Sequence, residues 1–177
     1  MRGIVMYGIL FICHGNICRS PTAEMILKDM ANKCGAAEQL RIESRATSTE
    51  EISGGIGNPI YPPAKRELER HGIPCGNKRA QLLKQGDAML FDLLICMDQA
   101  NMRNALRIIG SDPGGKLHLL TEYSGRNSEI ADPWYTGNYD LAFREIYAGC
   151  AALMRTLARE NKMKSHGFSE LFSGLEK

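Results

Sequence analysis

The sequence predicts a single α/β domain in which helices flank a four-stranded parallel sheet. Apolar runs of strand length alternate along the chain with segments that carry the apolar spacing of amphipathic helices. Neither an internal repeat nor a break in composition marks a second domain, and 177 residues are enough for one hydrophobic core. We therefore expect one domain over residues 1–160, with right-handed crossovers between its strands, followed by a polar tail over residues 161–177.

The N-terminal part of the chain predicts a strand, a helix and a second strand. Residues 6–12 form a near-continuous apolar run, which is typical of a central parallel strand buried on both faces. Pro21 then begins a helical pattern that continues to Ala31 and is closed by Gly35, because proline suits the first turn and glycine the position after the last. Residues 40–44 are expected to form the second strand.

The rest of the chain repeats this alternation. Residues 53–63 are so rich in Gly and Pro that we expect an irregular surface loop. The remaining predictions are helices at residues 64–71, 82–90, 98–109 and 139–160, strands at residues 92–97 and 116–120, and a loop at residues 123–137. The tail carries apolar side chains at helical spacing, which favours a short helix packed on the domain: Phe168, Leu171, Phe172 and Leu175.

Composition and charge exclude several classes of function. The 22 Lys and Arg residues against 20 Asp and Glu residues give a net charge of +2, so no global field indicates nucleic acid or an anionic membrane as partner. The six cysteines are scattered through a chain that can fold without disulfides, which favours a reducing cytoplasmic compartment. The apolar stretch near the N-terminus is too short to span a membrane and lacks the small residues of a signal-peptide cleavage site.

The most informative segment lies between the first predicted strand and the first predicted helix and reads CHGNICRSP, residues 13–21. In an open parallel sheet, ligands bind at the carboxyl ends of the strands, where this segment must lie. A tight turn there directs successive backbone N–H groups and the positive end of a helix dipole inward, as an anion requires. The segment therefore predicts a phosphate-binding loop formed by His14, Gly15, Asn16, Ile17, Cys18 and Arg19.

Cys13 and Arg19 supply the chemistry of this loop. The inward N–H groups and the guanidinium would favour the thiolate of Cys13, which could then attack phosphorus at neutral pH. Arg19 offers a planar fork for two phosphate oxygens. Gly15 allows close approach of the backbone, and Asn16 suits a left-handed turn.

Two other interpretations of the loop are open. A cysteine and an arginine at this spacing often occur together by chance, although the preceding strand and the following Ser-Pro argue against coincidence. Cys13, His14 and Cys18 are also conceivable zinc ligands. No second pair with ligand spacing follows them, so we expect neither a metal nor any other cofactor.

A phosphoryl-transfer site built on a thiolate also needs an acid that protonates the leaving oxygen. The candidate is Asp132, which precedes Pro133, Trp134 and Tyr135 after the fourth predicted strand. The two rings could grip an aromatic substrate. The same four residues are equally typical of a turn, so the residues alone leave the role of Asp132 open.

Taken together, these motifs resemble the low molecular weight protein tyrosine phosphatases. The resemblance rests mainly on FICHGNICRSP at residues 11–21 and DPWY at residues 132–135. Four further segments follow in the family's order: RATS at 45–48, GNP at 57–59, RHGIP at 70–74 and ICMD at 95–98. The match extends from about residue 9 to about residue 157, and PIYPPAK at residues 59–65 is similar to the bacterial branch of the family.

The resemblance implies metal-independent hydrolysis of protein phosphotyrosine through a phosphocysteine intermediate. Cys13 would be the nucleophile, Arg19 the phosphate ligand, and Asp132 the general acid and then the general base. Asn16, Ser20 and Ser44 would hold the loop in shape, and Ile17, Glu50, Trp134 and Tyr135 would form the substrate cleft. We also expect oxidation to join Cys13 and Cys18 in a disulfide, because a thiolate oxidises readily and the curled loop brings the second sulfur near.

Two departures from the family pattern leave the substrate preference open. Glu50 stands about where many members have an aromatic residue of the cleft wall, and Asn77 stands where some have a second His. Phosphoarginine is an alternative substrate, but the arginine phosphatases of this family have Thr at the position of Ile17. The partner would be a phosphotyrosine-containing protein rather than nucleic acid or a membrane, and nothing indicates the oligomeric state.

Two alternative functions are less favoured. An arsenate reductase on the same fold would need closely spaced cysteines on a mobile segment, and Cys75 and Cys96 are too far apart in the sequence. A catalytically inactive phosphate-binding module would lack the nucleophile or the acid, and both are present.

Overall fold

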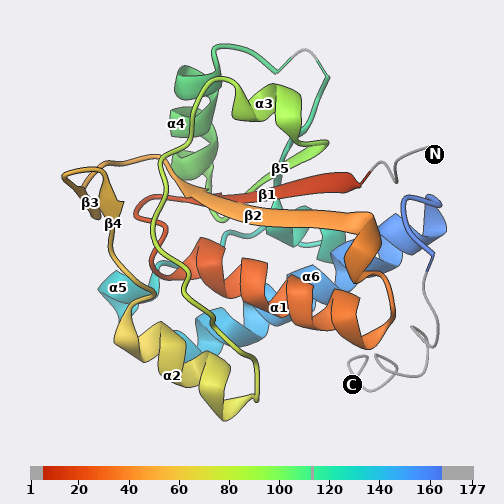
Figure 1. Cartoon of the computed structure of the whole chain (residues 1–177), viewed down its shortest axis with the longest axis horizontal. Helices are drawn as coiled ribbons and strands as arrows, with labels where there is room; N and C mark the ends of the chain where they lie inside the picture. Colours follow the sequence, from red (N-terminus) through yellow and green to blue (C-terminus); the bar gives the residue numbers. More distant parts are fainter. Residues whose placement is uncertain (1–5, 113, 165–177) are drawn as a thin grey trace.

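The computed structural model describes residues 6–112 and 114–164, and it has the α/β architecture that the sequence predicts. Four parallel strands form the sheet in the order β2-β1-β5-β6, and Figure 1 labels the first three of them. The strands are β1 (Tyr7–Cys13), β2 (Leu40–Ala46), β5 (Leu93–Cys96) and β6 (Leu117–Leu119). The chain runs from β1 to β2 on one side and later returns to β5 on the other. The carboxyl end of β1 is therefore the point where ligands bind in such sheets.

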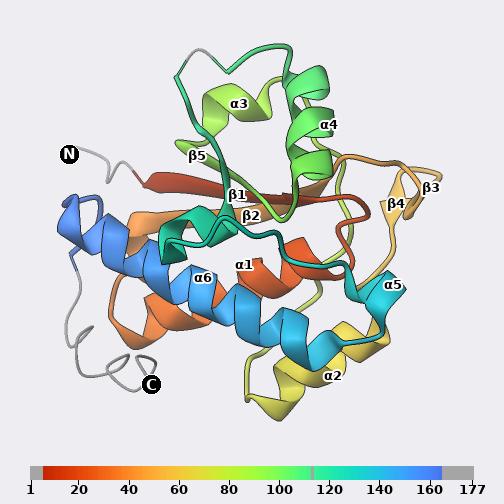
Figure 2. The same ribbon diagram turned by 180° about the vertical axis from the view of Figure 1, so that it is seen from behind.

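Helices cover both faces of the sheet. One face carries α1 (Arg19–Lys33), α2 (Pro62–Arg70) and α6 (Tyr139–Arg159), and the other carries α3 (Asp87–Leu90) and α4 (Gln99–Ile109) (Figure 2). The side chains of β1 alternate between the two cores. Ile9 and Phe11 pack on the side of α1 and α6, whereas Leu10 and Ile12 pack on the side of α4. All four are fully buried, which confirms the predicted central strand.

Three short elements complete the connections. These are the 3-10 helices η1 (Ala37–Gln39) and η2 (Leu120–Ser124) and the single turn α5 (Pro133–Thr136). The loop after β1, the hairpin of β3 (Ile52–Ser53) with β4 (Ile56–Gly57), and α5 lie at one end of the molecule, on the left in Figure 1. None of the helices in the described ranges is long and apolar enough to cross a membrane.

The loop predicted at residues 53–63 contains more structure than expected. Its first part forms the antiparallel hairpin of β3 and β4, and α2 begins at Pro62, two residues before the predicted start. Gly57 lets this hairpin lie against the following segment, because a Cβ there would come within 1.9 Å of the Ala80 carbonyl oxygen. A composition rich in Gly and Pro does not reveal such a contact with a distant backbone segment.

The helix predicted at residues 82–90 is wrong for its first half, since only Asp87–Leu90 is helical. The preceding residues run alongside β2. Ala46 N donates to the Gln81 carbonyl, and Leu83 N donates to the Ala46 carbonyl. This pairing uses backbone groups that a helix would need for itself.

The loop predicted at residues 123–137 contains the helical turn α5. Asp132 caps this turn by accepting a hydrogen bond from Trp134 N, and Pro133 occupies its first position. A turn this short has no periodicity to detect in the sequence. The helix predicted around residues 168–175 of the tail lies outside the described residues.

Candidate active site

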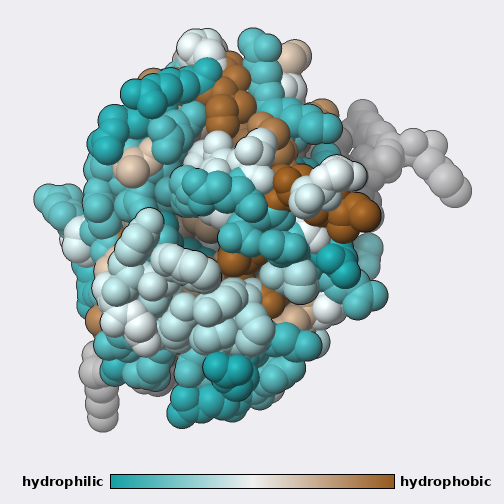
Figure 3. Space-filling view, turned by 90° about the vertical axis from the view of Figure 1, so that its left-hand side faces the viewer, coloured by the Kyte–Doolittle hydropathy of each residue, from teal (hydrophilic) through white to brown (hydrophobic). Residues whose placement is uncertain are grey.

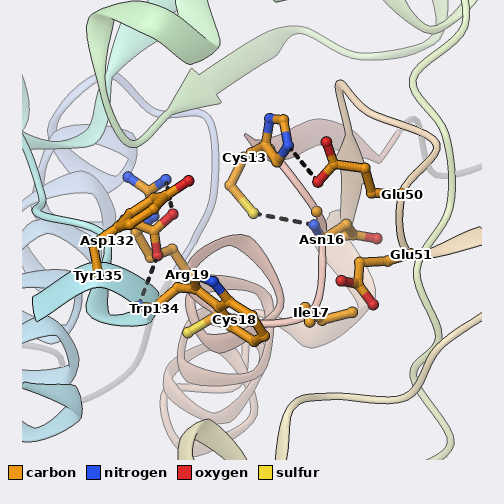
Figure 4. Close-up of a pocket in the computed structure, with 12 residues that line it drawn as sticks. Cys13, Asn16, Ile17, Cys18, Arg19, Glu50, Glu51, Asp132, Trp134 and Tyr135 are labelled. Atoms are coloured by element: carbon orange, nitrogen blue, oxygen red, sulfur yellow. Dashed lines mark hydrogen bonds and ion pairs between the residues drawn. The ribbon is translucent and has the colours of Figure 1, made fainter. Parts of the chain in front are cut away.

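A pocket opens at the carboxyl end of β1, and residues from distant segments line it (Figure 4). The loop after β1 forms its floor, the hairpin side contributes Glu50 and Glu51, and the start of α5 contributes the opposite side. The lining residues are Cys13, His14, Gly15, Asn16, Ile17, Cys18, Arg19, Glu50, Glu51, Asp132, Trp134 and Tyr135. Every residue that the sequence predicted for the catalytic loop and the cleft is in this set.

The loop curls around the sulfur of Cys13. Asn16 N donates to Cys13 Sγ over 3.3 Å, and the Ser20 hydroxyl lies 3.0 Å from the same sulfur. Asn16 has a φ of 57°, in the left-handed region that asparagine tolerates better than most residues. The helix α1 begins at Arg19, so its positive end also faces the sulfur. These donors and the helix end would stabilise an anion that is bound beside the sulfur.

A chain of buried side chains holds the loop in this shape. Asn16 Nδ2 donates to the hydroxyls of Ser20 and Ser44, each over 2.8 Å, and Asn16 Oδ1 accepts from Gln81 N over 2.9 Å. Asn16, Ser20 and Ser44 are at most 1% exposed. One amide thus ties together the loop, the first turn of α1, β2 and the extended segment after α2.

A buried ion pair continues this chain behind the loop. The Ser44 hydroxyl donates to Glu24, and Glu24 pairs with Lys78 Nζ over 3.2 Å. Burial lowers the pKa of Lys78, although the adjacent Glu24 partly opposes this effect. Asn77, which stands where some family members have a second His, instead lines surface hollows away from the pocket floor. Lys78 therefore contacts the loop support, and Asn77 does not line the pocket.

Arg19 is buried and held from two sides. Its Nη1 donates to Asp98 over 2.7 Å and to the Ile130 carbonyl over 2.9 Å, and its Nη2 donates to Asp132 over 3.0 Å. Burial lowers the pKa of Arg19, but the negative charges of Cys13, Asp132 and Asp98 outweigh this effect and raise it. The guanidinium is thus a permanent positive charge in a fixed orientation beside the pocket floor.

The Asp132 carboxylate makes two contacts at once. One carboxylate oxygen pairs with Arg19, and the other accepts from Trp134 N at the start of α5. The turn that it caps carries Trp134 and Tyr135, which are 55% and 85% exposed and border the pocket. The ring of Tyr61 lies 5.0 Å from that of Trp134 and supports it from the side of α2.

Cys18 lines the same pocket but differs from Cys13 in its surroundings. Burial raises the pKa of the Cys18 thiol far above its ordinary value, and the negative charges of Cys13 and Asp132 add to this effect. Cys18 is therefore a neutral thiol in the same pocket as Cys13. As for metal ligands, residues 6–112 and 114–164 contain no group of three His, Cys, Asp or Glu side chains arranged to hold a metal ion.

Comparisons with known proteins agree with this geometry. The family model for low molecular weight phosphotyrosine protein phosphatase matches residues 8–164. The chain belongs to this phosphatase family. The Bacillus subtilis low molecular weight protein-tyrosine-phosphatase YfkJ is 32% identical over 161 residues, which cover 89% of this chain and 100% of that protein. The human low molecular weight phosphotyrosine protein phosphatase is 35% identical over 149 residues, which cover 83% and 90% of the two chains.

Solved structures of the phosphatase family share the fold. The crystal structure of YfkJ superposes with a TM-score of 0.80, covering 90% of this chain and 99% of that one at 32% identity. The structure of the low molecular weight protein tyrosine phosphatase from Streptococcus pyogenes gives a TM-score of 0.73 at 31% identity, covering 87% and 93%. The resemblance found in the sequence is thus confirmed for both the family and the fold.

The sequence did not identify three residues that belong to this site. Asp98 contacts Arg19 and also caps α4, Glu51 lines the pocket beside Glu50, and Glu24 anchors Ser44. Asp98 could have been found, because it directly follows the third sheet strand in the sequence, at the edge where ligands bind. Glu51 and Glu24 carry no such signal, since a carboxylate in a loop or on a helix is ordinary.

Proposed function

We propose that the protein hydrolyses phosphotyrosine in proteins, with Cys13 as the nucleophile and without a metal. The surroundings of the Cys13 sulfur carry this proposal. The sulfur lies among the Asn16 N–H, the Ser20 hydroxyl and the positive end of α1. Arg19 and Asp132, which contact each other, line the same pocket. Membership of the phosphatase family and the two aromatic side chains at the pocket mouth support phosphotyrosine as the substrate.

The reaction has two steps in this proposal. The Cys13 thiolate attacks phosphorus, the bond from phosphorus to the phenolic oxygen breaks, and Asp132 gives its proton to that oxygen. Water then attacks the phosphocysteine, Asp132 takes a proton from this water, and the thiolate leaves as inorganic phosphate is released. Arg19 and the loop N–H groups bind the three equatorial oxygens, whose charge must be stabilised in both transition states.

Asp132 pairs with Arg19 in the structure, with Arg19 Nη2 3.0 Å from its carboxylate. The same guanidinium would bind the phosphate of the substrate. A bound phosphate therefore competes with Asp132 for Arg19 and leaves the carboxyl group available to the leaving oxygen.

The role of Asp132 gives a first prediction. Asp132→Ala should lower kcat for a phosphotyrosine peptide by about 10² to 10³, because the phenolate must then leave without a proton. The loss should be much smaller for p-nitrophenyl phosphate, whose leaving group needs little protonation. Asp132→Asn is the matched control, since it preserves an N-cap for α5 but cannot transfer the proton. Recovery of the rate in Asp132→Asn would make Asp132 a structural residue.

A panel of phosphorylated peptides tests the substrate class. With a chelator present throughout, the enzyme should hydrolyse phosphotyrosine faster than phosphoserine or phosphoarginine in otherwise identical peptides. If the chelator removes the activity and zinc restores it, the metal-independent mechanism is wrong.

Ile17 gives a second prediction, on the choice between phosphotyrosine and phosphoarginine. This buried, branched side chain lines the pocket and would leave the donors of a guanidinium unpaired, at a cost of about 1 to 3 kcal/mol. We therefore expect kcat/KM to favour phosphotyrosine by roughly 5-fold to 150-fold. Ile17→Thr should shift the ratio towards phosphoarginine, and an unchanged ratio would show that another residue sets the choice.

Cys18 gives a third prediction, on oxidation. Peroxide should oxidise the Cys13 thiolate first, because the Cys18 thiol stays protonated. The Cys18 sulfur then displaces water from the sulfenic acid and forms a disulfide, which a thiol reductant reverses. The wild type should regain its activity after reduction, whereas Cys18→Ala should lose part of it permanently through further oxidation of Cys13. Full recovery of Cys18→Ala would exclude the protective disulfide.

A further inference from the structure

The mouth of the cleft has two unlike walls. Asp132, Trp134 and Tyr135 lie on one side, and Glu50, Glu51 and Ile17 lie on the other, as Figure 4 shows. The surface around this end of the molecule is mainly hydrophilic (Figure 3). A phosphotyrosine ring held between Trp134 and Ile17 would bring the neighbouring residues of a protein substrate close to Glu50 and Glu51, which line the same pocket.

Glu51 is held in place at this wall. Its Oε2 accepts from Asn58 Nδ2 over 2.7 Å, and its backbone carbonyl accepts from Asn58 N over 2.8 Å, which closes the hairpin of β3 and β4. Its Cγ lies against Gly15, where a Cβ would come within 3.1 Å. The carboxylate therefore has a fixed position relative to the phosphate-binding loop, and little conformational entropy is lost when it binds a ligand.

Within the described part of the chain, neither carboxylate forms an ion pair with a Lys or Arg side chain. Glu50 pairs with His14 Nε2 over 2.9 Å, and both side chains of this pair are largely exposed. Within residues 6–112 and 114–164, no Lys, Arg or His nitrogen lies within 4.0 Å of the Glu51 carboxylate. Both carboxylates line the same pocket, so a cation bound at its rim would contact a charge that the fold leaves available.

We propose that Glu50 and Glu51 make the enzyme select phosphotyrosine that is flanked by Lys or Arg. This inference rests on the proposed function, because it names the substrate class of the same cleft. Glu51 is the main determinant, since its position is fixed, and Glu50 shares its charge with His14. An acidic residue next to the phosphotyrosine would face the same carboxylates and be repelled.

The expected difference between the peptides is modest, because the carboxylates at the rim of the pocket are in contact with water. A single ion pair in contact with water changes an affinity by about twofold to fivefold. Attraction of an arginine together with repulsion of a glutamate should separate the two peptides by about tenfold in kcat/KM. The difference should lie mainly in KM, because a residue beside the phosphotyrosine is bound equally in the ground state and the transition state. It should decrease as salt is added.

The test uses three phosphotyrosine peptides that differ only in the residues on the two sides of the phosphotyrosine. Both flanking residues are Arg in the first peptide, Gln in the second and Glu in the third. The wild-type full chain is compared with Glu51→Gln and with Glu38→Gln. Glu38→Gln is the matched control, because it removes the same charge from an exposed residue just before the amino end of β2, whereas the pocket lies at the carboxyl end of the strands. Thermal unfolding of each variant shows whether it is folded.

For the wild type and for Glu38→Gln, we expect kcat/KM to be highest for the Arg peptide, intermediate for the Gln peptide and lowest for the Glu peptide. In Glu51→Gln, the ratio between the Arg and Glu peptides should fall at least about threefold. Equal rates for all three peptides in the wild type would overturn the selection by charge while leaving phosphotyrosine hydrolysis intact. Failure to hydrolyse any of them would instead overturn the proposed function. If Glu51→Gln keeps the wild-type preference for the Arg peptide over the Glu peptide, Glu51 does not determine this preference.

Discussion

Cys13→Ser is expected to abolish turnover, with a loss of at least about 10⁴-fold in kcat. A serine hydroxyl does not ionise among these donors as a thiol does, so no nucleophile remains. The change is nearly isosteric, and the neighbouring Asn16 N–H and Ser20 hydroxyl can hydrogen-bond the new oxygen, so the fold should persist. Steady-state rates with a phosphotyrosine peptide measure the effect.

Two controls accompany this variant. Wild-type enzyme stopped during turnover should carry a covalent phosphate on Cys13 in a mass spectrum, and Cys13→Ser should carry none. Inorganic phosphate should still bind to Cys13→Ser, because Arg19 and the loop are unchanged. Substantial turnover by a Cys13→Ser preparation that is free of wild-type enzyme would contradict the assignment of the nucleophile.

Arg19→Ala should have the second largest effect, with a loss of about 10³-fold in kcat/KM. The guanidinium provides the only side-chain cation among the residues that line the pocket in the described structure, apart from His14 when it is protonated. Its removal also leaves Asp98, which is 18% exposed, without its partner and should destabilise the fold by roughly 3 kcal/mol. Rates must therefore be normalised to the folded fraction, measured by thermal unfolding.

Arg19→Lys separates charge from geometry. Lysine keeps the positive charge but cannot reach Asp98, Asp132 and the phosphate together as the planar fork does. We expect Arg19→Lys to be more stable than Arg19→Ala but still strongly impaired in catalysis. Wild-type rates in Arg19→Lys would show that a simple positive charge is sufficient.

Parts of the fold could be predicted because their cause is local. The first strand was predicted because its residues are apolar without interruption, and the helix after it because Pro21 marks its first turn. The segment before Asp87 could not be predicted, because it bonds to Ala46, which lies far away in the sequence. Its extended form comes from the tertiary structure and not from its own residues.

The residues of the site also fall into a group that the sequence predicts and a group that it does not. Cys13, Asn16 and Arg19 lie within seven residues of one another, so their spacing alone indicates a phosphate-binding loop. The residues that adjust this loop come from elsewhere in the chain, such as Asp98 beside Arg19 and Glu24 behind Ser44. Only the packing of distant segments brings them together, and a single sequence does not encode that proximity in its spacing.

The position of Cys13, the proposed nucleophile, at the end of β1 has a consequence for local unfolding. The amides of β1 lie in the middle of the sheet, where hydrogen exchange requires opening of the whole domain. Trp134 lies on a single helical turn, and Glu51 directly precedes a hairpin of two two-residue strands; neither element is part of the four-stranded sheet. Amides near these two residues should therefore exchange much faster than those of β1. We therefore expect substitutions near Trp134 and Glu51 to be tolerated while β1 keeps Cys13 in place.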